Sequence, residues 1–224
     1  MLEEIKRNVG VAAAEMVQEG MVVGLGTGST AGFFIEALIS RCKEGLNITA
    51  VATSQQSRSH AEEGGITVLD INDVEHIDLT VDGADKVDSM KRIVKGLGGA
   101  LLREKIVATA SKEVVVIVDE VKVVSVLEDF VLPVEVVPFG WKMTLARITA
   151  QGYRAVPRND LDGKLYITDN GNYIVDIHHA GVCKNPEMMH HTILTMPGVV
   201  ETGFFFGLAS RIVIGNKDGS IEIR

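Results

Sequence analysis

The sequence predicts an α/β protein with a Rossmann-like parallel sheet, helices on both faces, and an inserted ferredoxin-like α+β domain. Three observations lead to this fold class. Helical and strand periodicities alternate along residues 1–129, as they do around parallel sheets. Each predicted strand there is an apolar run that ends in polar residues. After Asp129 the order changes to strand, helix, strands, helix and strand, which is typical of a ferredoxin-like sandwich.

The opening helix is predicted to be amphipathic and to end near Gly20, because apolar residues recur at helical spacing: Leu2, Ile5, Val9, Ala12, Ala13, Met16 and Val17. A second helix begins near Ser29 and a third ends near Glu63. The predicted strands are MVVGL, ITAVATS, TVLD, DLTVDGAD and EVVVIVDE. Ligands of parallel sheets bind at the carboxyl ends of strands. Polar residues gather at those ends here: Thr27–Thr30, Thr53–Ser54, Asp82–Asp85 and Asp119–Lys122.

The second half of the chain predicts a smaller domain. Strand VLPVEVVP precedes a helix over 141–150, and strands YRAVP, KLYIT and NYIVDI follow, the last two joined by a DNGN hairpin turn. Asn185–Pro186 predicts a capped helix start, and a strand begins at Val199. The ending SRIVIGNKDGSIEIR is expected to return to the first sheet. The predicted domains are therefore 1–129 with 204–224, and an inserted 130–203.

Composition excludes some classes of protein. The 224 residues are 46% hydrophobic and carry 22 Lys+Arg against 30 Asp+Glu, a net charge of −8. Such an acidic chain is a poor candidate for binding nucleic acid, although local donors can still bind a small anion. The two distant cysteines, Cys42 and Cys183, favour a reducing cytoplasm. No signal peptide or membrane-spanning run is expected.

The glycine-rich stretch GLGTGST is the first candidate site. It resembles a dinucleotide fingerprint, but Ser29 occupies the position of the third glycine. The stretch offers N–H groups at a helix start, with the hydroxyls of Thr27, Ser29 and Thr30, which suits a monophosphate. An ordinary turn capped by Ser29 explains it equally well.

Two charged motifs follow. In DGAD, Asp82 and Asp85 could share sugar hydroxyls and transfer protons. Asp-Gly is also a common pair of turn residues, and the motif taken alone favours an ordinary turn. In KGLGGALLREK, Lys95 precedes a glycine turn, and Glu104 is expected two turns inside the next helix, too far in to cap it. Glu104 could pair with neighbouring cations on the surface, but its place beyond the glycines suits a base.

The six histidines suggest a metal site only weakly. His178–His179 and His190–His191 are adjacent pairs, and neighbouring side chains on a strand or helix point apart. We therefore expect no metal.

The motifs GLGTGST, ATS, DGAD, KGLGGALLREK and LPVEVVPFGW occur in the order found in type A ribose-5-phosphate isomerase, and the chain resembles that family over nearly its whole length. The resemblance implies interconversion of D-ribose 5-phosphate and D-ribulose 5-phosphate through a cis-enediolate, without metal or organic cofactor. It also implies a homodimer or homotetramer. We expect the 130–203 domain to contribute to oligomer contacts.

The resemblance also implies roles for individual residues. Glu104 is the proton-transferring base, and Asp82, Asp85 and Lys95 are the other catalytic residues. Lys6 and Lys122 help to bind the phosphate. The remaining substrate-binding residues are Thr27, Gly28, Ser29, Thr30, Gly83, Ala84, Gly96, Leu97 and Gly98.

Two residues depart from the family pattern. Lys86 stands where the family usually has an acid, and Leu97 where it usually has a glycine. Lys86 is expected to add positive charge near the site, and Leu97 is expected to resist left-handed backbone conformations.

Two other functions compete with the isomerase. A sugar-phosphate-binding regulator of the same fold would need a DNA-binding segment, for which the two domains leave no room. A nucleotide-dependent oxidoreductase is disfavoured by the broken fingerprint.

Overall fold

The computed structural model describes residues 2–224, which form two compact units. Unit 1 comprises the chain up to Ala84, Arg103–Val123 and Gly207–Arg224, and unit 2 comprises Asp85–Leu102 and Val124–Phe206. Residues 85–102, 124–129 and 204–206 therefore group with unit 2, although the sequence placed them outside the inserted segment. The expected division of labour between a catalytic and an inserted domain stays a prediction.

Unit 1 is built on a seven-stranded sheet with the order β14-β13-β7-β4-β1-β2-β3. Its strands are β1 (Val22–Leu25), β2 (Thr49–Ala52), β3 (Thr67–Val68), β4 (Ile77–Gly83), β7 (Ser111–Asp119), β13 (Arg211–Gly215) and β14 (Ile221–Ile223). All neighbours are parallel except β13 and β14. The predicted parallel sheet and the return of the C-terminal strands to it are confirmed.

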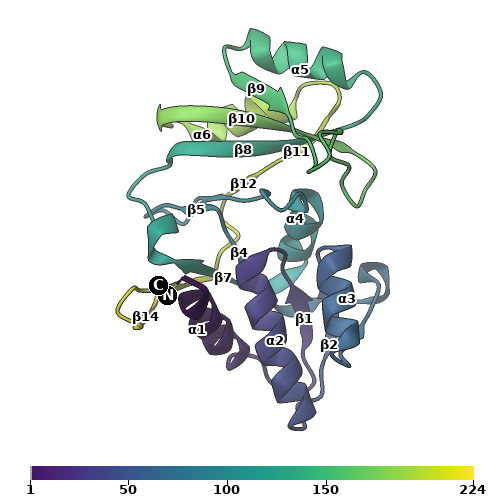
Figure 1. The fold of residues 1–224 in the computed structure, drawn as a ribbon, viewed down its shortest axis with the longest axis vertical. Helices are drawn as coiled ribbons and strands as arrows, with labels where there is room; N and C mark the ends of the chain where they lie inside the picture. The colour runs from purple at the N-terminus through teal and green to yellow at the C-terminus, as the bar shows by residue number, and fades with distance from the viewer. Residues whose placement is uncertain (1) are drawn as a thin grey trace. The chain divides into compact units, whose positions relative to one another are not determined.

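Helices cover both faces of this sheet (Figure 1). On one face, α1 (Leu2–Ala14), α2 (Ser29–Lys43) and α3 (Gln55–Glu63) share a core with Val23 and Leu25 of β1. On the other, Val107 of α4 (Leu101–Thr109) packs with Val51 and Ile77. Strand side chains alternate between faces, so each strand contributes to both layers. Short 3₁₀ helices lie at Ile71–Asp73 (η1) and Glu120–Lys122 (η2).

The first helix is shorter than predicted, because it ends at Ala14 and not near Gly20. The Arg41 guanidinium donates to the carbonyl oxygen of Ala14 and, at 2.8 Å, to that of Val17. These bonds satisfy carbonyl groups that a longer helix would use. Val17 remains buried after the helix has ended, which is why the apolar spacing overstated the helix length.

Unit 2 contains the predicted ferredoxin-like sandwich. Its elements follow the order β8 (Glu128–Val136), α5 (Trp141–Ala150), β9 (Arg154–Pro157), β10 (Tyr173–Val182), α6 (Pro186–Leu194) and β11 (Val199–Thr202). The four strands form an antiparallel sheet with the order β11-β8-β10-β9. A second, three-stranded sheet joins β12 (Phe204–Phe205), β6 (Ile93–Val94) and β5 (Lys86–Val87). As predicted, Asn185 caps α6 by accepting from the Met188 N–H at 3.0 Å.

The predicted strand KLYIT is wrong: the segment makes only isolated bridges, Asn159 to Leu165 and Ile167 to Tyr173. The DNGN turn is present, because the Thr168 N–H donates to the Asn172 carbonyl at 2.9 Å. Side chains of this turn bend over the fully buried Glu135, whose Oε1 accepts from Thr168, Asn170 and Asn172. These side-chain bonds replace a regular ladder.

No helix within residues 2–224 is long and apolar enough to cross a membrane.

Candidate active site

The strand order of unit 1 reverses between β1 and β4, since the chain continues from β1 to β2 on one side and from β4 to β7 on the other. Such switch points are the usual ligand sites of open parallel sheets. There, backbone N–H groups of the loop after β1 donate to residues at the carboxyl end of β4. The Gly26 N–H donates to the Val81 carbonyl at 2.9 Å, and the Thr27 N–H donates to Asp82 Oδ1 at 3.1 Å.

Asp82 is held in a fixed position at this switch point. Its Oδ1 also accepts from the Gly83 N–H at 2.7 Å, and the residue is only 4% exposed. A Cβ on Gly26 would lie 2.6 Å from the Asp82 Cα, so only glycine allows the loop after β1 to approach the end of β4 this closely. Backbone N–H groups therefore help to fix one carboxylate at the strand end.

The glycine loop leads into α2 with Gly28 at the N-cap, at a φ of 101°. Ser29 is the first helical residue, so the alternative in which Ser29 caps the helix is wrong. No side chain caps this helix start. The Ser29 hydroxyl instead accepts from Lys6 Nζ at 2.9 Å, while Thr27 Oγ1 lies 2.6 Å from Thr53 Oγ1. The structure thus brings Lys6 to the predicted anion cradle.

Glu104 lies in the first turn of α4 and not two turns inside it. The helix begins later than the sequence suggested, because the positive φ of Gly99, 81°, keeps the chain out of helical geometry. Glu104 is 3% exposed, which excludes a solvated surface ion pair. Lys122, in η2, donates from Nζ to the Ala84 carbonyl at 2.8 Å, which brings it to the DGAD motif.

The remaining predicted residues belong to unit 2. Asp85 Oδ2 accepts from the Leu97 N–H at 3.1 Å, so the second aspartate is bound to the KGLGG loop. Lys95 is 4% exposed, and its backbone N–H donates to the Gly203 carbonyl at 2.8 Å. Its Nζ lies 5.8 Å from the centroid of the Phe205 ring. The Lys95 side chain is therefore buried beside the Phe205 ring.

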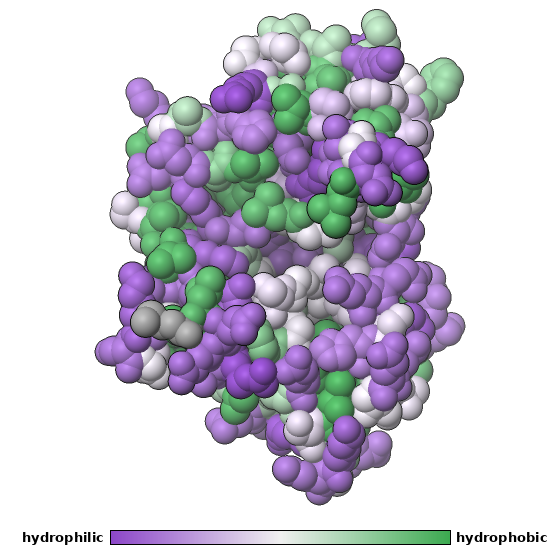
Figure 2. All heavy atoms as spheres, viewed as in Figure 1, coloured by the Kyte–Doolittle hydropathy of each residue, from purple (hydrophilic) through white to green (hydrophobic). Residues whose placement is uncertain are grey.

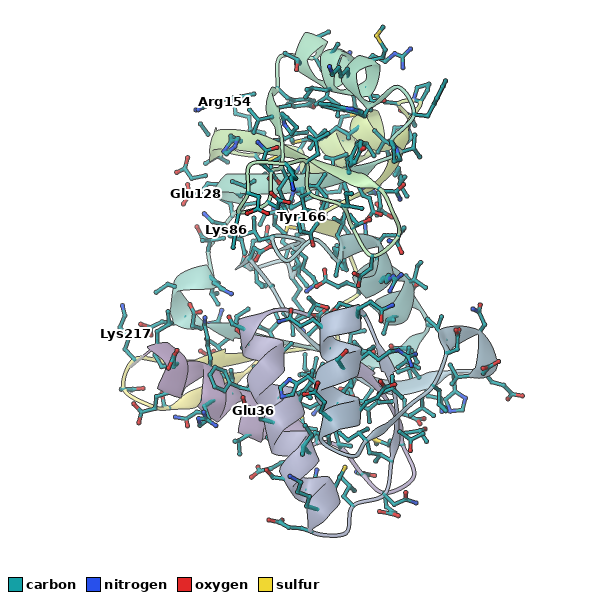
Figure 3. All side chains as sticks on the ribbon, turned by 45° about the vertical axis from the view of Figure 1, so that its right-hand side comes forward. Glu36, Lys86, Glu128, Arg154, Tyr166 and Lys217 are labelled. Atoms are coloured by element: carbon teal, nitrogen blue, oxygen red, sulfur yellow. The ribbon has the colours of Figure 1, made fainter. Side chains whose placement is uncertain are left out.

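The two departures from the family pattern are accommodated within unit 2. Lys86 Nζ donates to the Glu128 carbonyl at 2.5 Å, and Figure 3 shows the two side chains on neighbouring segments. Within residues 2–224 the non-glycine residues with positive φ are Lys91 and Asp129. Leu97 is therefore not in the left-handed region, in agreement with the expectation that it resists left-handed backbone conformations.

Several histidines are engaged in packing. The His179 ring stacks on Phe130 with centroids 4.9 Å apart, and His190 Nδ1 lies 2.7 Å from Thr202 Oγ1. In the part of the chain that the structure describes, no three His, Cys, Asp or Glu side chains gather in a way that could hold a metal ion.

A cleft of about 490 Å³ in unit 1 lies elsewhere, between α1 and α2. Arg7 crosses it to reach Glu36 at 3.2 Å and stacks over Phe33, and none of the predicted site residues lines it. Hydrophilic residues dominate this part of the surface in Figure 2. Its mixture of charges points to no ligand.

Comparison with known proteins identifies the family. A model of the family "Ribose 5-phosphate isomerase A (phosphoriboisomerase A)" matches residues 49–219. The ribose-5-phosphate isomerase A of Protochlamydia amoebophila (strain UWE25) is 44% identical over 218 residues, covering 97% of this chain and 94% of the relative. The chain belongs to the ribose-5-phosphate isomerase A family.

Solved structures of this family share the fold. The ribose 5-phosphate isomerase A of Methanocaldococcus jannaschii superimposes with a TM-score of 0.92 at 35% identity, covering 99% of this chain and 98% of that one. A D-ribose-5-phosphate isomerase in complex with phospho-erythronic acid superimposes with a TM-score of 0.94 at 34% identity, covering 100% and 99%. The resemblance inferred from five short motifs is confirmed.

Proposed function

We propose that this chain interconverts D-ribose 5-phosphate and D-ribulose 5-phosphate with Glu104 as the base. The observation that carries the proposal is the 44% identity to a ribose-5-phosphate isomerase A along 97% of the chain. The ligand of the related complex, phospho-erythronic acid, fits the same chemistry. Its carboxylate spreads negative charge over two oxygens, as an enediolate does.

The reaction moves a carbonyl group from C1 to C2. A base removes the proton from C2, a cis-enediolate forms, the hydroxyl proton moves from O2 to O1, and the base returns a proton at C1. One carboxylate can serve both carbons if it is held within hydrogen-bond reach. Glu104 suits this role, because the first turn of a helix fixes its backbone and burial excludes competing water. Lys95 supplies positive charge to the developing oxyanions.

The cyclic form of the aldose must open before this step. In ring opening, the C1 hydroxyl gives its proton to a carboxylate, the bond from C1 to the ring oxygen breaks, and the ring oxygen gains a proton. Asp82 and Asp85 are assigned to this step and to hydroxyl binding, because backbone N–H groups fix both carboxylates.

The phosphate is assigned to the uncapped start of α2, Thr27–Thr30, together with Lys6 and Lys122. N–H groups at a helix start and nearby cations are a common anion site. The contact of Lys6 with Ser29 at 2.9 Å supports this assignment. Gly83, Ala84 and the loop Gly96–Gly98 complete the proposed binding residues.

We infer that the reaction needs no metal or organic cofactor, since a carboxylate, a lysine and N–H donors supply each proton transfer and charge contact. The expected assembly is a homodimer or homotetramer with unit 2 contributing contacts, and the expected location is the cytoplasm. Activity should survive exhaustive chelation, and activity lost on chelation and restored by a divalent ion would refute this part of the proposal.

The direct test is to mix the purified protein with ribose 5-phosphate and assay for ketose. The competing function, a regulator that binds sugar phosphate, predicts stabilisation by ribose 5-phosphate in a thermal-shift assay without ketose formation. NAD and duplex DNA serve as controls in the same assay. Turnover of ribose 5-phosphate would exclude a purely regulatory role.

A further inference from the structure

Three consecutive carbonyl groups of the loop after Lys95 are bound by side chains from the segment between β9 and β10. Arg158 Nη1 donates to the Gly96 carbonyl at 3.0 Å and to the Leu97 carbonyl at 2.9 Å. The Tyr166 hydroxyl donates to the Gly98 carbonyl at 3.3 Å. All of these residues belong to unit 2.

The guanidinium of Arg158 is itself fixed. Its Nε donates to Asp176 Oδ2 at 2.8 Å and its Nη2 donates to Oδ1, a bidentate pair in which the two side chains are 12% and 15% exposed. Bidentate pairs of this kind define direction as well as distance. The Tyr166 ring lies 5.9 Å from the guanidinium carbon, and burial raises the pKa of Tyr166, which keeps its hydroxyl a donor.

These bonds determine where the loop's N–H groups point. In a trans peptide the C=O and N–H groups point in opposite directions. Holding the Gly96 carbonyl at Arg158 therefore directs the Leu97 N–H away from Arg158. That N–H donates to Asp85 Oδ2 at 3.1 Å. A single peptide unit thus connects the guanidinium to the second aspartate of DGAD.

The course of this loop requires glycine at two positions. Gly96 has a φ of 103°, and a Cβ there would lie 2.9 Å from the Leu101 Cβ. Gly99 has a φ of 81°, and a Cβ there would collide with Tyr166. The Gly96 carbonyl also accepts from the Gly99 N–H at 2.9 Å, which closes a backbone turn. A loop this rich in glycine has many alternative conformations, so we expect the side chains that bind it, together with this turn, to select its course.

We propose that Arg158, fixed by Asp176, is a positioning residue that aims the Asp85 carboxylate for opening the sugar ring. This inference rests on the proposed function, in which Asp85 serves ring opening and Glu104 serves proton transfer between C1 and C2. Arg158 acts through the peptide between Gly96 and Leu97. Its loss should impair the ring step and spare the proton transfer.

The two steps can be measured separately, because ribulose 5-phosphate cannot form a furanose ring when its C5 oxygen carries the phosphate. Exchange of its C1 hydrogen in deuterated water needs the base but no ring opening. Arg158→Met should lower kcat for ribose 5-phosphate about a hundredfold, as a displaced catalytic group does. At saturating ribulose 5-phosphate, where weaker binding no longer limits the rate, the C1 exchange should stay near the wild-type rate. Asp85→Asn should give the same pattern.

The matched control is Arg154→Met, since Arg154 is an exposed arginine of β9 that extends outward in Figure 3. It should leave both rates unchanged. Arg158→Met in the Asp85→Asn background should cause no further loss, because two residues that act through one contact are not additive. If Arg158→Met does not fold, Asp176→Asn keeps the arginine and should lower ring-dependent turnover by a smaller factor.

Three results would overturn the inference: an equal fall of turnover and exchange, unchanged turnover, or additive losses in the double variant. A wild-type protein that makes no ribulose 5-phosphate would instead contradict the proposed function.

Discussion

In both units, hydrogen bonds from backbone and side-chain groups hold the proposed site residues in position, but the cause of that position differs between the units. In unit 1, Thr27 and Asp82 meet because Thr27 follows β1, Asp82 lies at the carboxyl end of β4, and the two strands are parallel neighbours in the sheet. In unit 2, Asp85 meets Leu97, and the loop of Leu97 is bound by Arg158 from irregular chain between β9 and β10. A topological rule places the first pair, and individual side chains place the second.

This difference teaches where a variant should act. Strand ends in unit 1 are held by the whole sheet, so changing one side chain there should remove its chemistry and leave the geometry. The loop in unit 2 depends on a few side chains, so changes there should also disturb geometry.

The largest effect is expected for Glu104→Gln. Glutamine keeps the size of the side chain but cannot accept the proton. Because a positioned base contributes roughly a hundred- to ten-thousand-fold in rate, turnover should fall at least that far while the variant folds and binds ribose 5-phosphate. In deuterated water the wild type should exchange hydrogen at C2 of the substrate and the variant should not. Near-normal exchange would move the base to Asp82 or Asp85.

Lys95→Ala should come next, with kcat reduced more than substrate binding is weakened. A lysine that faces a developing enediolate acts mainly in the transition state, and losing such a donor typically costs about a hundredfold in kcat. Steady-state kinetics separate the two effects. A rise in KM alone would make Lys95 a ground-state ligand of the phosphate or hydroxyls.

Much of unit 1 was predictable from sequence, and three of its proposed site residues show why. Strand–helix alternation placed Thr27, Asp82 and Lys122 at one edge of the sheet, and the structure brings Thr27 to Asp82 and Lys122 to Ala84. The roles of these residues stay predictions.

The errors fell where side chains override local patterns. Arg41 ends the first helix at Ala14, and Glu135 draws in the turn after the expected strand KLYIT. Arg158 carried no signal in the sequence, because its partners are carbonyl groups 61 and 62 residues away. Such contacts follow from the tertiary fold and from no local period.

Lys122→Ala should raise KM steeply and nearly preserve kcat, which is the opposite of Lys95→Ala. A hydrogen bond to a charged group contributes about 1.5–3 kcal/mol, so KM should rise about tenfold or more. Lys217→Ala is the control. Lys217 is exposed, and its Nζ lies 3.2 Å from Oε1 of Glu120, which belongs to η2, the 3₁₀ helix that also contains Lys122. Figure 3 shows Lys217 at the outside of unit 1. A fall in kcat with unchanged KM would place Lys122 at the reacting carbons.

The smallest expected effect is a loss of stability on changing Asp78, at the opposite end of strand β4 from Asp82. Asp82 lies at its carboxyl end, whereas Asp78 lies near its amino end, where it accepts from Lys112 Nζ at 2.8 Å and from the Val22 N–H at 2.9 Å. The hydrogen bond from Lys112, followed by that from the Val22 N–H, lowers the pKa of Asp78. A lowered pKa in the folded state stabilises the protein at pH values above the unfolded pKa, about 3.9.

Asp78→Asn should therefore reduce the free energy of unfolding by about 1 kcal/mol at pH 7, a modest value because Lys112 is largely exposed. The difference from wild type should shrink as the pH falls through the folded pKa of Asp78, since protonation then removes the same charge from the wild type. Denaturant unfolding from pH 7 to pH 3 measures this. Turnover at pH 7 should stay at the wild-type value, because the amino ends of parallel strands lie opposite the ligand-binding edge. A large loss of turnover with unchanged stability would show that the amino end of β4 takes part in the reaction, and would remove the contrast between the two ends of the strand.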